Sequence, residues 1–420
     1  MAKDCISKKL LVLGGVAQLC GVIEGAQQYG YYVIVVDNIE GSPGKKIADE
    51  SHLISITDVN AIVDLCRQRD VDGVMNYCID PAQKPYQRIC QELNLPCYGT
   101  KLQFDILSNK DMFKEICVEY GVDVVPEYQI DDMFSEEGLS GVQFPVVVKP
   151  ADGRASKGLT ICLRKEDITV AYEKALDYSI RKVVKFEQYL RCPELCAKYF
   201  VCDGEIFLTA FSDTHTCYIG NDRVYIHGKS YPSKYYDLFK STADEKLRNL
   251  IRGIGIKNGP LSFTGFIDGD KFRFFDPSFR MGGGQEWATI EAATKINIAD
   301  CLTRFAMTGT MGDVDVLRVL DHGFSNKFSI TVQVLVKLGR IAKIKGIDDV
   351  MALDSVVGYH MSHFEGDCVV NASTSDQVLL RVMMVAECPE ALKNDYVKFQ
   401  ESLVVLGDDG ESMLLPYFAY

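Results

Sequence analysis

Short apolar runs alternate with amphipathic segments over the first part of the chain. Lys9–Leu13, Tyr32–Val36 and Gly73–Asn76 are apolar over the length of a strand. Between them, Gln18–Tyr29 and Val59–Arg69 repeat apolar positions at helical spacing. Because strands that alternate with helices usually pair in parallel, this pattern predicts a doubly wound parallel-sheet domain over residues 1–108.

The pattern changes after Ser108. Asn109–Tyr120 has apolar positions at helical spacing and is followed by a glycine and an extended stretch. Strand-length runs then dominate, with hairpin turns at Cys202–Gly204 and Ile267–Asp270. A central α+β domain, largely antiparallel, is therefore predicted over residues 109–325.

The last part of the chain is again rich in strands. Ser329–Val336 and Ser402–Leu406 have the pattern of strands, and Thr374–Cys388 has the pattern of a helix. These segments predict a C-terminal strand-rich subdomain over residues 326–420.

Composition narrows the class of protein. The 420 residues carry a formal net charge of -13 without a dense run of Lys and Arg, so no nucleic-acid partner is expected. No apolar run approaches the ~20 residues of a membrane span, so no membrane partner is expected. The 15 cysteines form no CxxC pair, which is typical of reduced thiols and of a cytoplasmic protein.

A glycine-containing turn follows the first predicted strand. Leu13–Gly21 and Asp37, at the end of the next strand, have the layout of a dinucleotide fold. The glycines at 14, 15 and 21 do not match the G-x-G-x-x-G spacing, although a dehydrogenase stays an alternative.

Lys149 ends an apolar strand and precedes a turn of small residues. Such a turn exposes backbone N–H groups to anions, and the lysine supplies a point charge for phosphate oxygens. The turn is not a P-loop, because the G-x-x-x-x-G-K-[ST] run is absent. The candidate phosphate-binding positions are Lys149, Asp152, Gly153, Ser156 and Gly158.

A second apolar strand ends in Glu187. The extended segment that follows can read an adenine edge through its backbone, and Glu194 lies within reach of a ribose. The candidate positions on this side are Glu187, Gln188, Tyr189, Leu190 and Glu194.

Asp276, Ser278 and Arg280 alternate along a third strand and therefore share one face, ahead of Gly282–Gly284. A carboxylate, a hydroxyl and a guanidinium side by side suit Mg²⁺ with phosphates, because Mg²⁺ takes few carboxylates and shares its other positions with phosphate oxygens and water. Asp276 and Ser278 are the candidate metal ligands.

The order of these features resembles the ATP-grasp superfamily, in its branch of carbamoyl-phosphate synthetases and biotin carboxylases. The resemblance implies an ATP-grasp fold with a small lid lobe at about residues 125–190 of the central domain. It places two ATP-contacting lysines at Lys110 and Lys149, a loop over the phosphates at 152–158, and the adenine-side hinge at Glu187–Leu190. Arg280 matches the arginine that steadies the acyl-phosphate and the transferred phosphoryl group.

Two positions depart from the family pattern. The first metal-binding glutamate is replaced by Thr264, and the asparagine two positions after the second carboxylate is replaced by Ser278. Among these positions Asp276 alone carries a charge, which puts metal affinity and catalysis in question. A nucleotide-binding protein without turnover is therefore the second hypothesis.

The resemblance also implies the substrate side of the site, with a polar and aromatic character that suits a small metabolite. Its candidate positions are Asp213, His215, Lys229, Lys234, Gly283, Gly284 and Glu286. The leading hypothesis is a ligase that uses ATP and Mg²⁺ to activate a small carboxylate for attack by an amine or similar nucleophile. Relatives in this family are commonly homodimers, so a homodimer is among the expectations.

Overall fold

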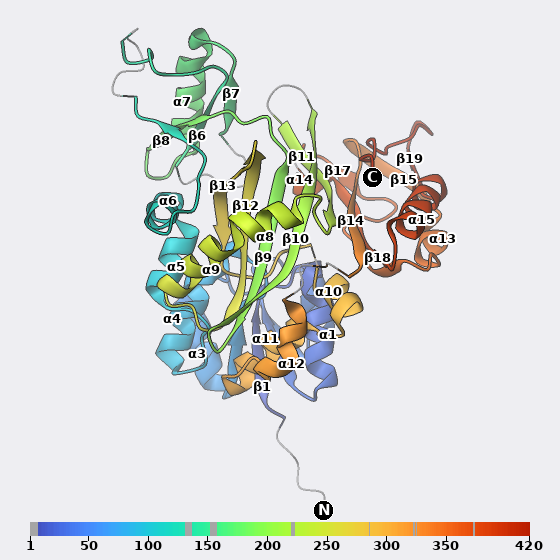
Figure 1. Ribbon diagram of the computed structural model, residues 1–420. Helices are drawn as coiled ribbons and strands as arrows, with labels where there is room; N and C mark the ends of the chain where they lie inside the picture. The colour runs from blue at the N-terminus through green and yellow to red at the C-terminus, as the bar shows by residue number, and fades with distance from the viewer. Residues whose placement is uncertain are drawn as a thin grey trace, which may run out of the picture.

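The computed structural model describes residues 7–130, 137–151, 158–219, 223–284, 286–321, 324, 326–372 and 374–420. Figure 1 shows a blue parallel-sheet region at the bottom, a long antiparallel sheet rising from it, a small lobe at the upper left and a C-terminal region at the right. This mixed α/β architecture confirms the predicted fold class.

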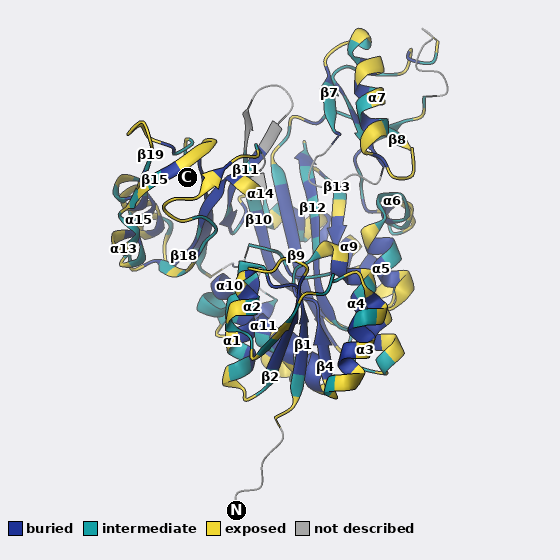
Figure 2. Ribbon diagram, turned by 180° about the vertical axis from the view of Figure 1, so that it is seen from behind, coloured by how far each residue is buried: buried dark blue, intermediate teal, exposed yellow. Residues whose placement is uncertain are grey.

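The N-terminal region is a four-stranded parallel sheet in the order β3-β2-β1-β4. Its strands are β1 (Lys9–Leu13), β2 (Tyr32–Val36), β3 (Glu50–His52) and β4 (Gly73–Met75). Its helices are α1 (Cys20–Gln28), α2 (Pro43–Ile47), α3 (Val59–Arg69), α4 (Gln83–Leu93) and α5 (Lys101–Ser108). The sheet has helices on both sides, and its strands β1, β2 and β4 are mostly dark blue in the burial view of Figure 2. Because helices cover both faces of the sheet, β1, β2 and β4 are buried on both faces and form continuous apolar runs, whereas β3 is polar.

The turn after β1 is filled by the chain itself. The Gly15 amide donates to Asp37 Oδ2 (2.6 Å), and the Gly44 amide donates to the Gly15 carbonyl (2.7 Å). A Cβ at Gly15 would lie 2.4 Å from Ser42 Oγ. The glycines therefore let the start of α2 pack closely on this turn. In a dehydrogenase the pyrophosphate of the cofactor would occupy this space, so the packing argues against that alternative.

A small lobe follows helix α6 (Lys110–Glu119) and contains a four-stranded antiparallel sheet in the order β5-β8-β6-β7. The strands are β5 (Glu127–Tyr128), β6 (Val146–Pro150), β7 (Thr160–Cys162) and β8 (Val184–Gln188), and helix α7 (Ile168–Tyr178) packs on one face. We call β5–β8 together with α7 the small lobe.

The largest sheet has eight antiparallel strands in the order β13-β12-β9-β10-β11-β14-β18-β16. Its first five are β9 (Glu194–Cys202), β10 (Glu205–Ile219), β11 (Arg223–Tyr231), β12 (Gly259–Asp268) and β13 (Lys271–Ser278). The turns between β9 and β10 and between β12 and β13 are the two predicted hairpins. The helices of this region are α8 (Tyr236–Thr242), α9 (Asp244–Gly253), α10 (Glu286–Thr294), α11 (Ile298–Thr308) and α12 (Val314–Leu317), of which α11 packs on β4 and α1 of the N-terminal region.

The C-terminal region continues the same sheet. Strand β14 (Phe328–Leu335) pairs directly with β11, and β18 (Val378–Ala386) and β16 (Val356–Met361) follow it. A separate sheet holds β15 (Gly339–Lys345), β17 (Cys368–Val369) and β19 (Val404–Gly407), with helices α13 (Ile347–Met351), α14 (Thr374–Gln377) and α15 (Pro389–Ser402). The helix predicted over 374–388 is wrong: only its first four residues are helical, and residues 378–386 form β18.

One face of the large sheet is polar. Residues directly opposite each other on neighbouring strands point to the same face. One row across the sheet is therefore Asp276, Thr264, Cys196 and Ser212; the next is Glu194, Thr214, Lys229 and Thr331. The opposite face carries core residues such as Ala197 and Phe263. We call the polar side the site face.

The packing of the parallel sheet against α11 can be tested by substitution at Gly73. A Cβ there would lie 2.4 Å from the Ala306 carbonyl oxygen and 2.8 Å from Met307 Sδ on α11. We expect Gly73→Ala to lower the free energy of unfolding by about 2 kcal/mol, measured by urea denaturation, because backbone has to move. Gly41→Ala, with no atom within 4 Å of the added Cβ, is the control and should change stability little.

Candidate active site

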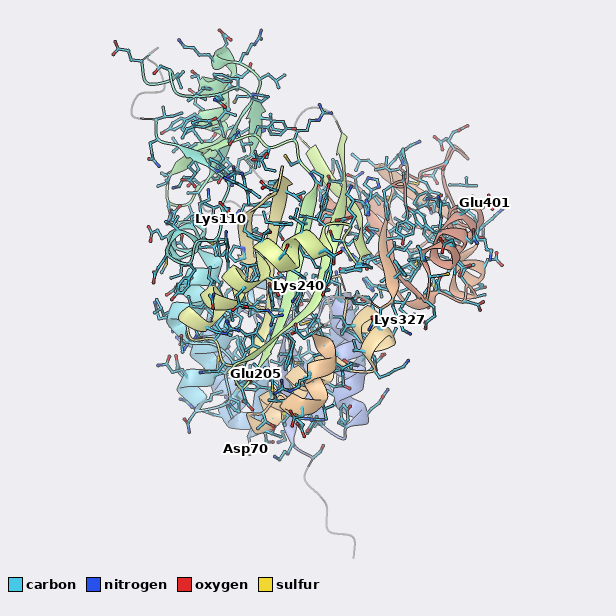
Figure 3. All side chains as sticks on the ribbon, in the orientation of Figure 1. Asp70, Lys110, Glu205, Lys240, Lys327 and Glu401 are labelled. Atoms are coloured by element: carbon cyan, nitrogen blue, oxygen red, sulfur yellow. The ribbon has the colours of Figure 1, made fainter. Side chains whose placement is uncertain are left out.

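The candidate site lies between the small lobe and the site face. Figure 3 labels Lys110, which begins α6 below the small lobe and beside the large sheet. Its Nζ is 3.5 Å from Asp276 Oδ1 on β13. Because these two predicted positions come from different elements and meet here, the structure brings the two ends of the predicted ATP site together.

Glu187 is the centre of a buried charge cluster. Its carboxylate contacts Lys149 Nζ (2.5 Å) and Lys114 Nζ (2.6 Å), and Lys114 also pairs with Glu127. Lys149 and Glu187 lie diagonally across the β6–β8 pair and share one face. Burial acts to raise the pKa of Glu187, but the two ammonium groups outweigh it and lower the pKa. Burial lowers the pKa of Lys149, while Glu187 opposes that shift.

A partly exposed set of ion pairs joins the small lobe to α6. Asp111 Oδ1 lies 2.9 Å from Lys185 Nζ, and Asp111 Oδ2 lies 2.8 Å from Arg181 Nη2. Lys185 also contacts Glu127 (3.2 Å). The start of α6 and the small lobe are therefore held together by charge as well as by the Glu187 cluster.

Glu194 occupies the other side of the site face. Burial, reinforced by Asp276 and opposed by Lys229, raises the pKa of Glu194 to about 7. Thr214 lies directly opposite on β10. At neutral pH the protonated and ionised forms of this carboxyl group are therefore both populated.

Arg280 is fixed by the N-terminal region. Its Nε and Nη2 donate to the two carboxylate oxygens of Asp80, both at 2.7 Å, and its Nη1 donates to the Met281 carbonyl (2.7 Å). A bidentate pair of this kind fixes the plane of the guanidinium. Asp80 therefore sets the position of the arginine that sequence reasoning assigned to the transferred phosphoryl group.

Glu286 is a buried acid between lysines. It pairs with Lys198, and burial, which would raise its pKa, is outweighed by Lys198 and Lys229, so the pKa of Glu286 falls to about 2. The loop before it makes room: a Cβ at Gly282 would lie 2.4 Å from Glu286 Oε2, and one at Gly284 would lie 3.0 Å from Oε1. Gly283 has open space around its Cβ position.

Other predicted positions lie elsewhere. Asp213 accepts from Ser233 Oγ (2.5 Å) and from the Lys234 amide (3.4 Å), so it closes the turn after β11. The Lys234 ammonium lies over the Tyr235 ring, 5.0 Å from its centroid. His215 contacts Ser230 Oγ (2.9 Å) and stacks on Phe418. Asp213 and Lys234 therefore have structural roles in this turn.

The predicted phosphate loop falls largely outside the described residues, which exclude Asp152, Gly153 and Ser156. Gly158 has a φ of +76° and packs against Tyr178 and Pro150, where a Cβ would lie 2.8 Å from Tyr178 Cβ. Gln188 follows Glu187 at the end of β8, and Tyr189 and the buried Leu190 continue toward β9. The adenine-side role of these residues stays a prediction.

The magnesium prediction is met only in part by the donors. Asp276 supplies one carboxylate, and the buried Ser278 hydroxyl has no hydrogen-bond partner in the described part of the chain. No group of three or more His, Cys, Asp or Glu side chains among the described residues is arranged to hold a metal. The donors therefore fit Mg²⁺ that arrives with nucleotide phosphates, which complete its coordination.

Sequence reasoning missed Lys114, Lys198 and Asp80. Lys114 lies four residues after Lys110, so both project from one helix face. Lys198 lies four residues after Glu194, so the two share the site face of β9. Helical spacing predicts the position of Lys114, and strand alternation predicts that of Lys198. Asp80 lies in the N-terminal region, and no local sequence pattern indicates that it pairs with Arg280.

Comparison with known sequences gives partial matches. No protein-family model matches the chain. The formate-dependent phosphoribosylglycinamide formyltransferase of Prochlorococcus marinus (strain MIT 9515) is 25% identical over 192 residues, 44% of this chain and 48% of that protein. The 2-oxoglutarate carboxylase small subunit of Hydrogenobacter thermophilus is 24% identical over 204 residues, 44% of this chain and 43% of that protein. The chain thus spans about half the length of the curated relatives it matches.

Solved structures match almost the whole chain. An L-amino acid ligase from Bacillus licheniformis has a TM-score of 0.77 at 17% identity and covers 96% of this chain and 99% of its own. The phosphoribosylglycinamide synthetase of Anaerococcus prevotii has a TM-score of 0.76 at 16% identity, covering 96% and 100%. The biotin carboxylase domain of the Hydrogenobacter thermophilus 2-oxoglutarate carboxylase, in complex with MgADP and bicarbonate, has a TM-score of 0.76 at 17% identity, covering 97% and 91%.

The fold is therefore the ATP-grasp fold, as the sequence features predicted. The chain is thus similar to a formate-dependent phosphoribosylglycinamide formyltransferase in sequence, and to biotin carboxylase domains and an N5-carboxyaminoimidazole ribonucleotide synthetase from Thermotoga maritima in fold.

Glu286 provides a pH test of the site. We expect Glu286→Gln to lower the free energy of unfolding by about 3 kcal/mol at pH 7, because Lys198 and Lys229 lose their buried counter-charge. The pKa of Glu286 is depressed from 4.5 to about 2, so its contribution is complete above pH 4.5 and is lost as pH falls toward 2. Urea denaturation of both proteins between pH 3 and 7 measures this, and a gap that did not narrow in acid would contradict the assignment.

Proposed function

We propose that the protein is an ATP-dependent ligase that activates a small carboxylate as an acyl-phosphate for attack by an amine or similar nucleophile. ADP and phosphate are the other products. The relatives named above include a formyltransferase, an amino acid ligase and carboxylases, which supports this class of reaction. The assignment to this chain rests on the geometry of its own site.

The observation that best supports this proposal is the ion pair between Lys110 and Asp276. A buried Lys149–Glu187 ion pair lies on the small lobe that faces it. Two lysines and one carboxylate from three separate elements line the space where the small lobe faces the site face. Positive charge for phosphate oxygens and a carboxylate for Mg²⁺ are what phosphoryl transfer requires, since catalysis there is mostly positioning and electrostatic stabilisation.

In this proposal Lys110 and Lys149 hold the phosphates of ATP, and Asp276 with Ser278 hold the Mg²⁺ that enters with them. Arg280, oriented by Asp80, faces the oxygens that gain charge as the phosphoryl group moves to the substrate carboxylate. The segment Glu187–Leu190 contacts the adenine, and Glu194 contacts the ribose. Closure around the acyl-phosphate keeps water away from it.

The substrate side of the proposal is assigned to Lys229 and Glu286. Lys229 lies in the same row of the site face as Glu194, and Glu286 lies beside Lys198 at the loop that follows Arg280. Together with Arg280 these groups offer both signs of charge, which suits a small molecule that carries an anionic group and a polar or amino group.

Activity measurements test the proposal directly. ADP release is followed with a panel of carboxylates and amines, and the productive pair is then used for variants. We expect Lys149→Ala and Arg280→Ala each to lower kcat/KM by about 100-fold or more, because each removes a charge aimed at the phosphates.

Lys101→Ala is the matched control for those variants. The Lys101 side chain is 82% exposed and pairs with Asp105 away from the site, so its activity should equal that of the parent. Full activity in both Lys149→Ala and Arg280→Ala would refute these two assignments.

A second candidate function is nucleotide binding without turnover. The observation that favours it is the pairing of Thr264 directly with Asp276, where the family pattern has two carboxylates. For the ligase we expect ATP to raise the melting temperature several degrees more with Mg²⁺ than without it, because the metal links Asp276 to the phosphates. Equal shifts with and without Mg²⁺, with no ADP release from any pair, would favour the second function.

A further inference from the structure

Arg381 lies on the site face, in the part of the large sheet that the C-terminal region contributes. Met383 on β18 lies directly opposite Thr331, which in turn lies directly opposite Lys229 on β11. Arg381 is two residues from Met383 along the same strand, so its side chain points to the same face. Its Nε donates to Gln333 Oε1 (3.2 Å) on β14. The C-terminal region therefore adds a guanidinium group to the face that carries Lys229.

Helix α10 covers this part of the site face. Gly358 on β16 lies opposite Met383, and a Cβ at Gly358 would lie 3.6 Å from Ala288 Cβ on α10. Figure 1 shows α10 beside β18 and close to α1 of the N-terminal region. Because Glu286 is the first residue of α10, this carboxylate and Arg381 lie where the helix, the site face and the N-terminal region meet.

The groups that act on Arg381 come from α10 and from the N-terminal region. Burial lowers the pKa of Arg381, while Glu286 and Cys78, just after β4, oppose that shift. Burial raises the pKa of the Cys78 thiol to about 11, and Arg280 and Arg381 both act to lower it. Arg381 and Arg280 therefore lie near the same thiol, on the substrate side of the proposed phosphoryl transfer.

Cations outnumber carboxylates on this side of the site. Two ion pairs already use its carboxylates: Asp80 with Arg280, and Glu286 with Lys198. Lys229 and Arg381 form no ion pair with a carboxylate in the part of the chain that the structure describes. His360, directly opposite Arg381, stays neutral at pH 7, because burial and then Arg381 lower its pKa to about 4. Charge removed from water needs a counter-charge close by, and a ligand can bring one.

Buried hydroxyl groups lie beside these two cations. Thr331 is directly opposite Lys229, and Ser329, two residues earlier on β14, points to the same face. Among the described residues, neither hydroxyl has a hydrogen-bond partner. Each can donate to an oxygen atom, and hydrogen bonds to an ionised acceptor are the stronger ones. Hydroxyl donors beside cations without counter-charges suit the oxygens of a carboxylate or a phosphate.

We propose that the carboxylate substrate carries a second anionic group, a carboxylate or a phosphate, which Arg381 and Lys229 bind. The reacting carboxylate then lies toward Arg280, and the second group supplies the counter-charge that this part of the site face lacks. Arg381 thereby selects the substrate without taking part in the chemical step. This inference deepens the proposed function and rests on it for the identity of the ligand.

The test pairs acids of similar size that differ in one anionic group. Succinate is compared with butyrate, glutarate with valerate, and phosphoserine with serine, so the pairs distinguish a carboxylate from a phosphate as the second group. ADP release gives kcat and KM for each acid. We expect kcat/KM in the parent to be about tenfold or more higher for the dianionic member of at least one pair, because a site built to bind a charged group rejects an analogue without it.

Three variants identify the residue that causes this preference. Arg381→Gln should raise KM for the preferred acid about 30-fold and change kcat little, because the lost contact is to a group that does not react. Arg381→Lys keeps the positive charge and should restore part of the preference. Arg340→Gln is the matched control, because Arg340 also lies in the C-terminal region but is 52% exposed and pairs with Asp408. Its KM should equal that of the parent.

The melting temperature of the ligand-free protein gives a second readout. We expect Arg381→Gln to melt at or above the temperature of the parent, because the substitution removes a buried charge that has no counter-charge. A structural ion pair would have the opposite effect. A fall of several degrees in Arg381→Gln that Arg381→Lys does not show would reveal a counter-charge within the protein and would overturn the inference.

Direct binding separates the outcomes of the two proposals. Isothermal titration calorimetry measures the same six acids with ADP and Mg²⁺ present. If acids release ADP but the members of each pair are used and bound equally, or if Arg381→Gln keeps the preference of the parent, the inference is overturned and the ligase proposal stands. If no acid releases ADP but a dianionic acid binds the parent and not Arg381→Gln, the anion site stands and the ligase proposal falls. If no acid releases ADP or binds, both are overturned.

Discussion

The structure depends on one constraint, which is that charge removed from water must be compensated by groups close to it. Glu187 is balanced by Lys149 and Lys114, Glu286 by Lys198 with Lys229 nearby, and Arg280 by Asp80. In each set the partners come from elements that are distant in sequence. The charges that would act on a substrate are therefore the same charges that fix how the N-terminal region, the small lobe and the large sheet meet.

Strand alternation explains how one sheet serves both stability and chemistry. The side chains of β9 alternate between a core face, with Ala197 and Leu195, and the site face, with Glu194, Cys196 and Lys198. The core face packs against α8 and α9 through contacts such as the stacked rings of Phe211 and Phe239, 4.0 Å apart. The packing of one face thus holds the polar groups of the other at fixed spacing.

Much of this could be predicted from the sequence. Lys9–Leu13, Tyr32–Val36 and Val59–Arg69 have the predicted boundaries, because their patterns are long and regular. The helix prediction fails over Val378–Ala386, because this strand is buried on both faces and its apolar run has no period of two. Lys110 and Asp276 were predicted and do meet, whereas the partnership of Arg280 with Asp80 depends on domain packing that no local pattern encodes.

The pairing of β11 with β14 has a mechanical consequence. Because the eight strands form one continuous sheet, we expect the central and C-terminal regions to move together, and the small lobe, which has its own sheet and is joined by residues 121–126 and 189–193, to be the part whose position can change. Asp111 on α6 pairs with Arg181 and Lys185 of the lobe, and these side chains are partly exposed. Exposed ion pairs weaken as salt concentration rises, whereas buried pairs are screened much less, so ionic strength weakens the Asp111 ion pairs more than the buried Glu187 cluster.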